Sequence, residues 1–232
     1  MRKTFDQQLK LLSEELIHMG TLCETAIASA AEALKKHDLV LARRAISADQ
    51  VIDQEEREIE RLCLKLLLQQ QPVARDLRQI SSALKMITDM ERIGDQAADI
   101  SEIVLYMSET GLIPELHDIG NMAQATSSMV KRSVEAYASR DLKLAAQVIS
   151  DDDQVDAMFE AVKAELIKMI AQNPACGEQA LDLLMIAKYL ERIGDQATNI
   201  AEWVEFSILG RHPELDVEDT DAVEQREGCS EK

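Results

Sequence analysis

Two near-identical segments, Glu91-Arg-Ile-Gly-Asp-Gln-Ala-Ala-Asp-Ile100 and Glu191-Arg-Ile-Gly-Asp-Gln-Ala-Thr-Asn-Ile200, agree at eight of ten positions. Upstream of them, Ala31-Glu-Ala-Leu-Lys-Lys-His-Asp-Leu39 aligns with Val134-Glu-Ala-Tyr-Ala-Ser-Arg-Asp-Leu142 at an offset of 103 residues. Self-similarity at a fixed offset indicates an internal duplication. The sequence therefore predicts two equivalent halves, residues 1–108 and residues 109–210.

Apolar residues in the first half recur at alternating spacings of four and three, which is typical of a long packed helix. They are Phe5, Leu9, Leu12, Leu16, Met19, Cys23, Ala26, Ala30 and Ala33. This pattern predicts a first helix that ends near Lys36. A second helix is expected from an N-cap at Asp38 to about Gln69, and a third from an N-cap at Asp76 to about Ser108. The expected fold is all-α, with two tandem, pseudo-repeated three-helix bundles.

Charge and composition restrict the possible functions. The chain has 43 acidic and 25 basic residues, and its formal net charge of −18 disfavours binding to nucleic acid or to anionic membrane surfaces. The four cysteines, Cys23, Cys63, Cys176 and Cys229, are far apart, which predicts free buried thiols instead of a zinc site or disulfides. No apolar stretch approaches the length of a membrane span, so we expect a cytoplasmic protein without membrane insertion. Residues 211–232 are expected to form a flexible acidic tail.

Acidic residues form stripes on the predicted second and third helices of each half. Glu91, Asp95 and Asp99 share one face of a helix, opposite its apolar residues, and should point out of the bundle. Like charges at this spacing repel one another, and carboxylates on neighbouring helices can converge on hard divalent or trivalent cations. The predicted metal ligands are Asp49, Asp53, Glu91, Asp95, Asp99, Asp152, Asp156, Glu191, Asp195 and Asn199.

Other interpretations of these features remain open. The stripes could be solvated surfaces that Arg92 and Arg192 partly neutralise. Gly94 and the equivalent glycine of the second half could shape a site or simply relieve crowding between helices. Glu15 and His18 have the Glu-x-x-His spacing of di-iron bundles, but such a site needs two of these pairs and the chain has one.

The paired Glu-Arg-Ile-Gly-Asp segments, with Met19-Gly20 and Gln71-Pro72 followed by Asp76-Leu77-Arg78, make the chain resemble the PhoU family of bacterial phosphate-uptake regulators. The resemblance covers residues 1 to about 210 and implies two similar three-helix bundles. The family's metal motif, Glu/Asp-x-x-x-Asp, corresponds here to Asp49 with Asp53, Glu91 with Asp95, Asp152 with Asp156, and Glu191 with Asp195. Asn199 stands where the first half has Asp99, which suggests a weaker second site.

The resemblance implies a cytoplasmic adaptor without enzymatic activity. Such a protein would couple the ATPase of a phosphate ABC transporter to a membrane sensor histidine kinase and repress phosphate-starvation genes when phosphate is plentiful. A homodimer is expected, and the bound metal could be iron, zinc, magnesium or manganese. The alternatives are a metal-dependent enzyme built on the carboxylate clusters or a metal store. The sequence shows no nucleophile and base pair for catalysis, and it has few sites for storage.

Overall fold

The computed structural model describes residues 2–69, 72–110 and 117–211, and within these residues the chain is helical and contains no strand. The helices are α1 (Arg2–Lys36), α2 (Leu39–Gln69), α3 (Ala74–Thr110), α4 (His117–Ser139), α5 (Leu142–Gln172) and α6 (Gly177–Leu209), with a short 3₁₀ turn, η1 (Pro174–Cys176). None of these helices combines the length and the apolar composition needed to cross a membrane. The all-α prediction with three helices in each half is confirmed. The predicted acidic tail lies, apart from Arg211, outside the described residues.

Equivalent turns connect the first two helices of each half. Asp38 accepts hydrogen bonds from the backbone amides of Val40 and Leu41 at 2.9 and 3.2 Å, as its predicted capping role requires. Asp141 does the same at the start of α5, with equal distances to the amides of the second and third residues after it. The residues before these caps, His37 and Arg140, have positive φ angles of 53° and 57°. The duplication is therefore visible in the turns as well as in the helices.

The start of α3 differs from the prediction. The helix begins at Ala74, so Asp76 lies inside the first turn instead of preceding it. Its carboxylate reaches back and accepts a hydrogen bond from the amide of Val73 at 3.4 Å. This is the arrangement of a capping box, in which the third helical residue satisfies the amide before the helix. At its other end α3 continues to Thr110, two residues beyond the predicted end at Ser108.

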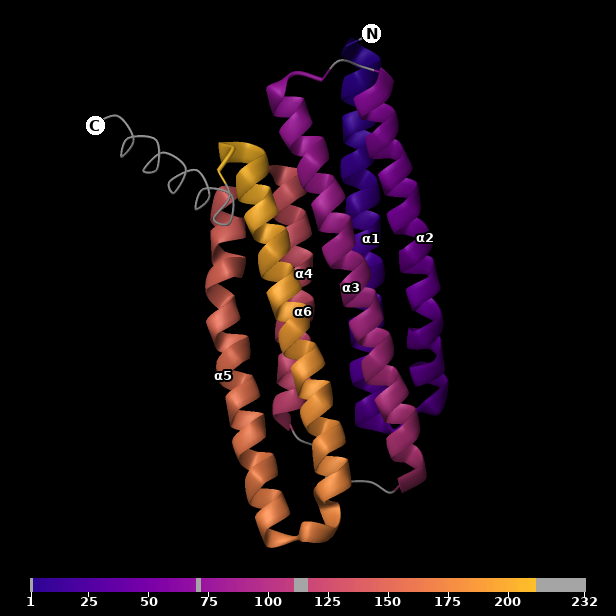
Figure 1. The fold of residues 1–232 in the computed structure, drawn as a ribbon, viewed down its shortest axis with the longest axis vertical. Coiled ribbons are helices and arrows are strands. Elements are labelled where there is room, and N and C mark those ends of the chain that lie inside the picture. Colours follow the sequence, from indigo (N-terminus) through magenta and orange to yellow (C-terminus); the bar gives the residue numbers. More distant parts are fainter. Residues whose placement is uncertain (1, 70–71, 111–116, 212–232) are drawn as a thin grey trace, which may run out of the picture.

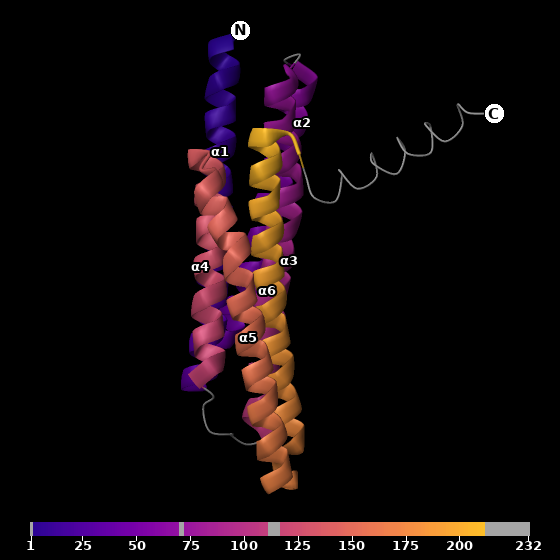
Figure 2. The same cartoon turned by 90° about the vertical axis from the view of Figure 1, so that its left-hand side faces the viewer.

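The two halves lie side by side and are shifted along the long axis, so that the start of α1 and the turn between α5 and α6 project at opposite ends (Figures 1 and 2). In Figures 1 and 2 the helices run along the long axis, with α2 and α5 at opposite sides in Figure 1. Contacts between the halves are made by α1 with α4 and by α3 with α6. A Cβ atom on Gly20 of α1 would lie 3.1 Å from Cγ2 of Val134, so the glycine permits this close approach. One continuous apolar core results, and α2 and α5 cover its flanks.

The described cysteines are free thiols, as predicted. Cys23 and Cys63 are buried in the core, and burial raises the pKa of each thiol to about 12. Cys176 is only half-buried, because it lies in the η1 turn at the end of the bundle, so the expectation of a buried thiol was wrong there. Cys229 is outside the described residues. High pKa values keep the two core thiols protonated, which suits a packing role.

Candidate functional site

The first acidic face forms where α2 packs against α3. Asp49 and Asp53 lie on α2, while Glu91, Asp95 and Asp99 lie on α3. The two stripes are close enough to repel each other: burial and then the charges of Asp95, Asp53 and Asp99 raise the pKa of Asp49 to about 6. The structure therefore brings together the five residues that the sequence predicted for this half.

Gly94 shapes this face by leaving room for a carboxylate. A Cβ atom at this position would lie 3.0 Å from Cδ1 of Ile52 and 3.1 Å from Oδ1 of Asp49. Contacts of 3.0–3.4 Å are tighter than most real Cβ contacts, so with an alanine here the buried Ile52 and the carboxylate of Asp49 would have to shift by a few tenths of an ångström. The structure shows that the glycine permits a close approach of α2 to α3, while a role in a metal site stays a prediction.

One oxygen of this face has no partner. Oδ1 of Asp49 is shielded from solvent and accepts no hydrogen bond, whereas Asp53 forms an ion pair with Arg57 at 3.1 Å. Burial and then neighbouring carboxylates also raise the pKa values of Glu91 and Asp95. A buried polar atom without a partner costs free energy, and a carboxylate costs more than a neutral group. The first face therefore has an unmet demand for positive charge.

The second half repeats this geometry between α5 and α6. Burial and then the charges of Asp195 and Asp156 raise the pKa of Asp152 to about 6. A Cβ atom on Gly194 would lie 3.3 Å from Oδ1 of Asp152, slightly farther than in the first half. Burial and then the charge of Glu191 raise the pKa of Asp195. Lys188 and, more weakly, Arg192 oppose the rise, and the contribution of Arg192 agrees with the partial neutralisation considered from the sequence.

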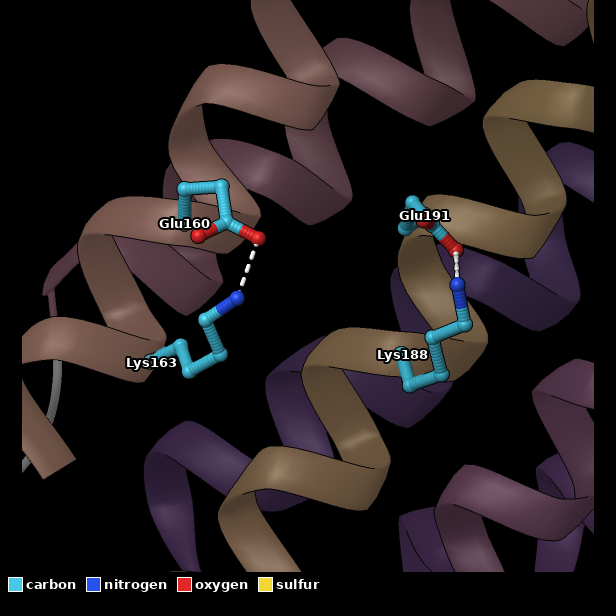
Figure 3. A network of polar contacts seen from close by, with 4 residues as sticks. All are labelled: Glu160, Lys163, Lys188 and Glu191. Carbon is cyan, nitrogen blue, oxygen red and sulfur yellow. Dashed lines mark hydrogen bonds and ion pairs between the residues drawn. The ribbon is translucent and has the colours of Figure 1, made fainter. Parts of the chain in front are cut away.

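Two lysines distinguish the second face, and the sequence analysis missed them. Lys163 pairs with Glu160, and Lys188 pairs with Glu191 (Figure 3). Both ammonium groups also lie over the ring of Phe159, at 5.6 and 5.3 Å from its centre. The i,i+3 spacing of each pair was the available signal in the sequence. The second face thus carries its own neutralising cations.

The Asp99 and Asn199 positions have different neighbours across the α3–α6 contact. Burial, followed by the charge of Asp99 and a hydrogen bond to it, raises the pKa of Tyr189. Asn199 instead lines a cavity of about 270 Å³ together with the buried Asp89, which forms an ion pair with Arg92 at 3.6 Å. A carboxylate at position 199 would add negative charge beside Asp89. This neighbour gives a physical reason for the amide in the second half.

The ten predicted ligands are half-buried or exposed, which confirms that they face outward from the apolar core. Across residues 2–69, 72–110 and 117–211, no three side chains of His, Cys, Asp or Glu are arranged so that they could hold a metal ion. Metal coordination by these residues would therefore need their carboxylates to turn toward a common point. Metal binding stays a prediction.

Another carboxylate contact lies on the α1–α2 surface. Burial and then a hydrogen bond to Glu15 raise the pKa of Glu55, and the charge of His18 opposes this rise. Sequence analysis singled out Glu15 and His18 but not Glu55, because only the packing of α1 against α2 brings it near. His18 is exposed, so this group lies on the surface and differs from the core site of a di-iron bundle.

Comparisons with known proteins agree with this architecture. The PhoU domain family matches the chain twice, at residues 16–104 and 119–204. A phosphate-specific transport system accessory protein PhoU homolog from Clostridium acetobutylicum is 37% identical over 215 residues, covering 92% of this chain and 98% of the relative. A relative of the same name from Rhizobium meliloti is 32% identical over 211 residues, covering 90% of this chain and 89% of the relative.

Solved structures give the same result. The crystal structure of PhoU from Pseudomonas aeruginosa has a TM-score of 0.85 and 33% identity, and the match covers 89% of this chain and all of that one. The phosphate transport system regulatory protein PhoU from Streptococcus pneumoniae has a TM-score of 0.82 and 27% identity, over 89% of this chain and 98% of that one. These relatives are named as accessory or regulatory proteins and not as enzymes, which confirms the prediction that this chain is not an enzyme. With both domain matches and relatives of nearly full length, this chain belongs to the PhoU family.

Proposed function

We propose that this protein is a cytoplasmic, metal-binding adaptor of phosphate uptake. It couples the ATPase of a phosphate ABC transporter to a membrane sensor histidine kinase and keeps phosphate-starvation genes repressed when phosphate is plentiful. Its relatives are accessory proteins of a phosphate-specific transport system, which supports this role. The active species in this proposal is a homodimer.

The metal-binding part of the proposal rests on one observation, the buried Oδ1 of Asp49, which lacks a hydrogen-bond donor. Carboxylate oxygens are the ligands preferred by hard cations, and no histidine or cysteine is needed to form such a site. A bound cation would supply the positive charge that the first face lacks. Candidate ligands in the two halves are Asp49, Asp53, Glu91, Asp95 and Asp99, and Asp152, Asp156, Glu191, Asp195 and Asn199.

Metal content of the purified protein tests this part directly. We expect elemental analysis to find bound iron, zinc, magnesium or manganese that chelation removes and titration restores. Asp95→Asn combined with Asp195→Asn keeps the side-chain shape but removes one charge from each face, so bound metal should fall. Unchanged metal content in the double variant would identify the stripes as solvated surfaces. Asp118→Asn, a change of a half-buried carboxylate in the first turn of α4, is the matched control.

Deletion of the gene tests the adaptor role. We expect phosphate-starvation genes to become active in phosphate-rich medium, and the wild-type gene to restore repression. Affinity purification from phosphate-replete cells should recover the transporter ATPase and the sensor kinase, and light scattering should give the mass of a dimer. Normal repression in the deletion strain would refute the adaptor role, whatever the metal content.

A further inference from the structure

Three arginines gather at one end of the bundle, where α3 and α5 begin and α6 ends (Figure 1). Arg75 and Arg78 belong to the first turns of α3, and Arg140 lies in the turn between α4 and α5. The hydroxyl of Tyr137, at the end of α4, donates a hydrogen bond to the carbonyl of Gln79 at 3.0 Å. This bond ties the end of α4 to the start of α3 and brings the arginines of the two halves near each other.

Their proximity also appears in the electrostatics of Arg140. Burial and then the charge of Arg75 lower the pKa of its guanidinium, and Arg78 acts in the same direction. Like charges close together are unfavourable unless an anion lies among them. These guanidinium groups therefore form a local excess of positive charge on a chain whose net charge is −18.

Arg78 is held in position by the end of α6. Gly210 ends this helix in a left-handed conformation, and a Cβ atom there would lie 3.4 Å from Cδ, Cζ and Nη1 of Arg78. The Nε atom of Arg78 is shielded from solvent and has no hydrogen-bond partner. A buried donor on a charged group that donates to nothing is costly, so the guanidinium of Arg78 lacks a hydrogen-bond acceptor that the described residues do not supply.

The protein offers these arginines no carboxylate among its described residues. No ion pair of residues 2–69, 72–110 or 117–211 includes any of the three. The neighbouring carboxylates cap helices instead: Asp76 accepts from the amide of Val73, and Asp141 accepts from the amides at the start of α5. The charge of the arginines is thus not balanced by their neighbours in sequence.

We infer that Arg75, Arg78 and Arg140 bind a phosphate group. The planar guanidinium fork matches the oxygens of a tetrahedral oxyanion and can donate two hydrogen bonds to it. The group can be free inorganic phosphate or the phosphoryl group of a nucleotide. This inference stands on the arginine geometry and is independent of the adaptor proposal.

Calorimetric titration of the full-length, chelator-treated protein with inorganic phosphate in a chloride buffer tests the site. We expect saturable binding that weakens at least about tenfold in Arg78→Gln and in Arg140→Gln, which corresponds to 1.4 kcal/mol or more. Arg78→Lys keeps the charge but loses the fork, so its affinity should fall between those of wild type and Arg78→Gln. Arg61→Gln, a change at an exposed position on α2, should bind as wild type does.

Further measurements separate the sources of the phosphate group and exclude binding through a metal. ATP and ADP titrated into the same protein show whether a nucleotide phosphoryl group competes with inorganic phosphate, and binding of either at the arginines supports the site. Asp49→Asn should retain phosphate binding, because the acidic face is not part of the site. Circular dichroism and melting curves verify that the arginine variants fold. Absence of saturable binding of phosphate and nucleotide below about 10 mM, or equal losses in Arg61→Gln, would overturn the inference.

Discussion

The two halves share one backbone plan but neutralise their acidic faces differently. Where α2 carries Glu56 and Glu60, the equivalent positions of α5 carry Phe159 and Lys163, and Thr88 of α3 is replaced by Lys188 in α6. In the second half, the ammonium groups of Lys163 and Lys188 lie over the ring of Phe159. They also pair with Glu160 and Glu191, respectively (Figure 3). In the first half, the corresponding positions add negative charge, and that of Glu56 acts on Glu91.

The two halves share their packing residues but differ in the charges on their outer faces. Gly94 and Gly194 occupy equivalent positions, and each allows the carboxylate of the adjacent helix, Asp49 or Asp152, to pack closely. Both halves keep these glycines and the apolar seams, which set how closely the helices of each half pack. Charges on the outer faces can vary at small cost, since exposed ion pairs contribute only about 0–1 kcal/mol each. We therefore expect the first half to bind cations more tightly than the second.

The largest expected effect is on metal affinity. Asp49→Asn removes the charge of the unpartnered carboxylate and should weaken metal binding in the first half by about tenfold or more, a loss of about 1.4–3 kcal/mol. Asp152→Asn should weaken metal binding by a smaller factor than Asp49→Asn does, because lysines already neutralise the second face. Titration of each chelator-treated variant with Mn²⁺, followed by electron paramagnetic resonance, measures both changes.

Equal losses in Asp49→Asn and Asp152→Asn would break the comparison, since they would show that the lysines do not affect cation binding. Asp118→Asn serves as the control for removal of one formal charge at a distance from both faces. Its affinity should match that of the wild type within the error of the titration.

The next effect is on stability. Gly94→Ala places a Cβ atom 3.0 Å from Cδ1 of the buried Ile52 and 3.1 Å from Oδ1 of Asp49. Overpacking costs about 1–3 kcal/mol, and the better helix propensity of alanine returns about 1 kcal/mol, so Tm should fall by about 2–4 °C. Gly194→Ala meets its nearest atom at 3.3 Å and should leave Tm unchanged or raise it slightly. Calorimetry measures the Tm of both variants. Equal shifts in Tm would show that the two halves are packed alike at these glycines.

Much of this architecture could be predicted from the sequence because its causes are local. Spacing of apolar residues gave α1 and its buried seam, and the duplication placed equivalent turns after Asp38 and Asp141. The predicted start of α3 was too late, since the helix begins at Ala74. An aspartate in the first turn of a helix can accept a hydrogen bond from the preceding amide, so its position alone does not show whether it lies before the helix or inside it.

Features that depend on contacts between helices could not be predicted in the same way. Asn199 shares a cavity with Asp89, on a helix of the other half, and the hydrogen bond from Tyr137 joins α4 to α3 where the three arginines lie. Likewise, helical spacing showed that Gly94 faces a neighbour but not that the neighbour is Asp49. Packing of one half against the other determines these environments, and the repeat pattern contains no information on it.

A smaller effect concerns pH. The pKa of Asp49 is raised from its ordinary 3.8 to about 6 in the folded protein. The carboxyl of Asp49 therefore binds its proton more tightly in the folded state than in the unfolded state. The stability that this protonation contributes is complete below about pH 4 and is lost as pH rises through about 6. The Tm of the metal-free protein should fall between about pH 4 and pH 6, and Asp49→Asn should make this fall shallower.

The same reasoning applies to Asp152, whose pKa is also raised to about 6. Asp152→Asn should therefore flatten the pH dependence of Tm as much as Asp49→Asn does, although the two variants differ in metal affinity. Melting curves in a chelating buffer at several pH values make this comparison. An unchanged slope in either variant would contradict the raised pKa of the carboxylate that was replaced.

The smallest effect comes from exchanging the neutralising lysine between the halves. Lys188 is about half exposed, so Lys188→Gln should change the free energy of unfolding by less than about 1 kcal/mol. Its removal frees Glu191 and withdraws a charge that lowers the pKa of Asp195, so cation affinity of the second half should rise severalfold. Measuring this rise in an Asp49→Asn background isolates the second face. The reciprocal variant, Thr88→Lys, puts an ammonium group beside the first face and should weaken its cation binding. If neither exchange moves affinity toward that of the other half, the difference between the two faces has a cause other than these lysines.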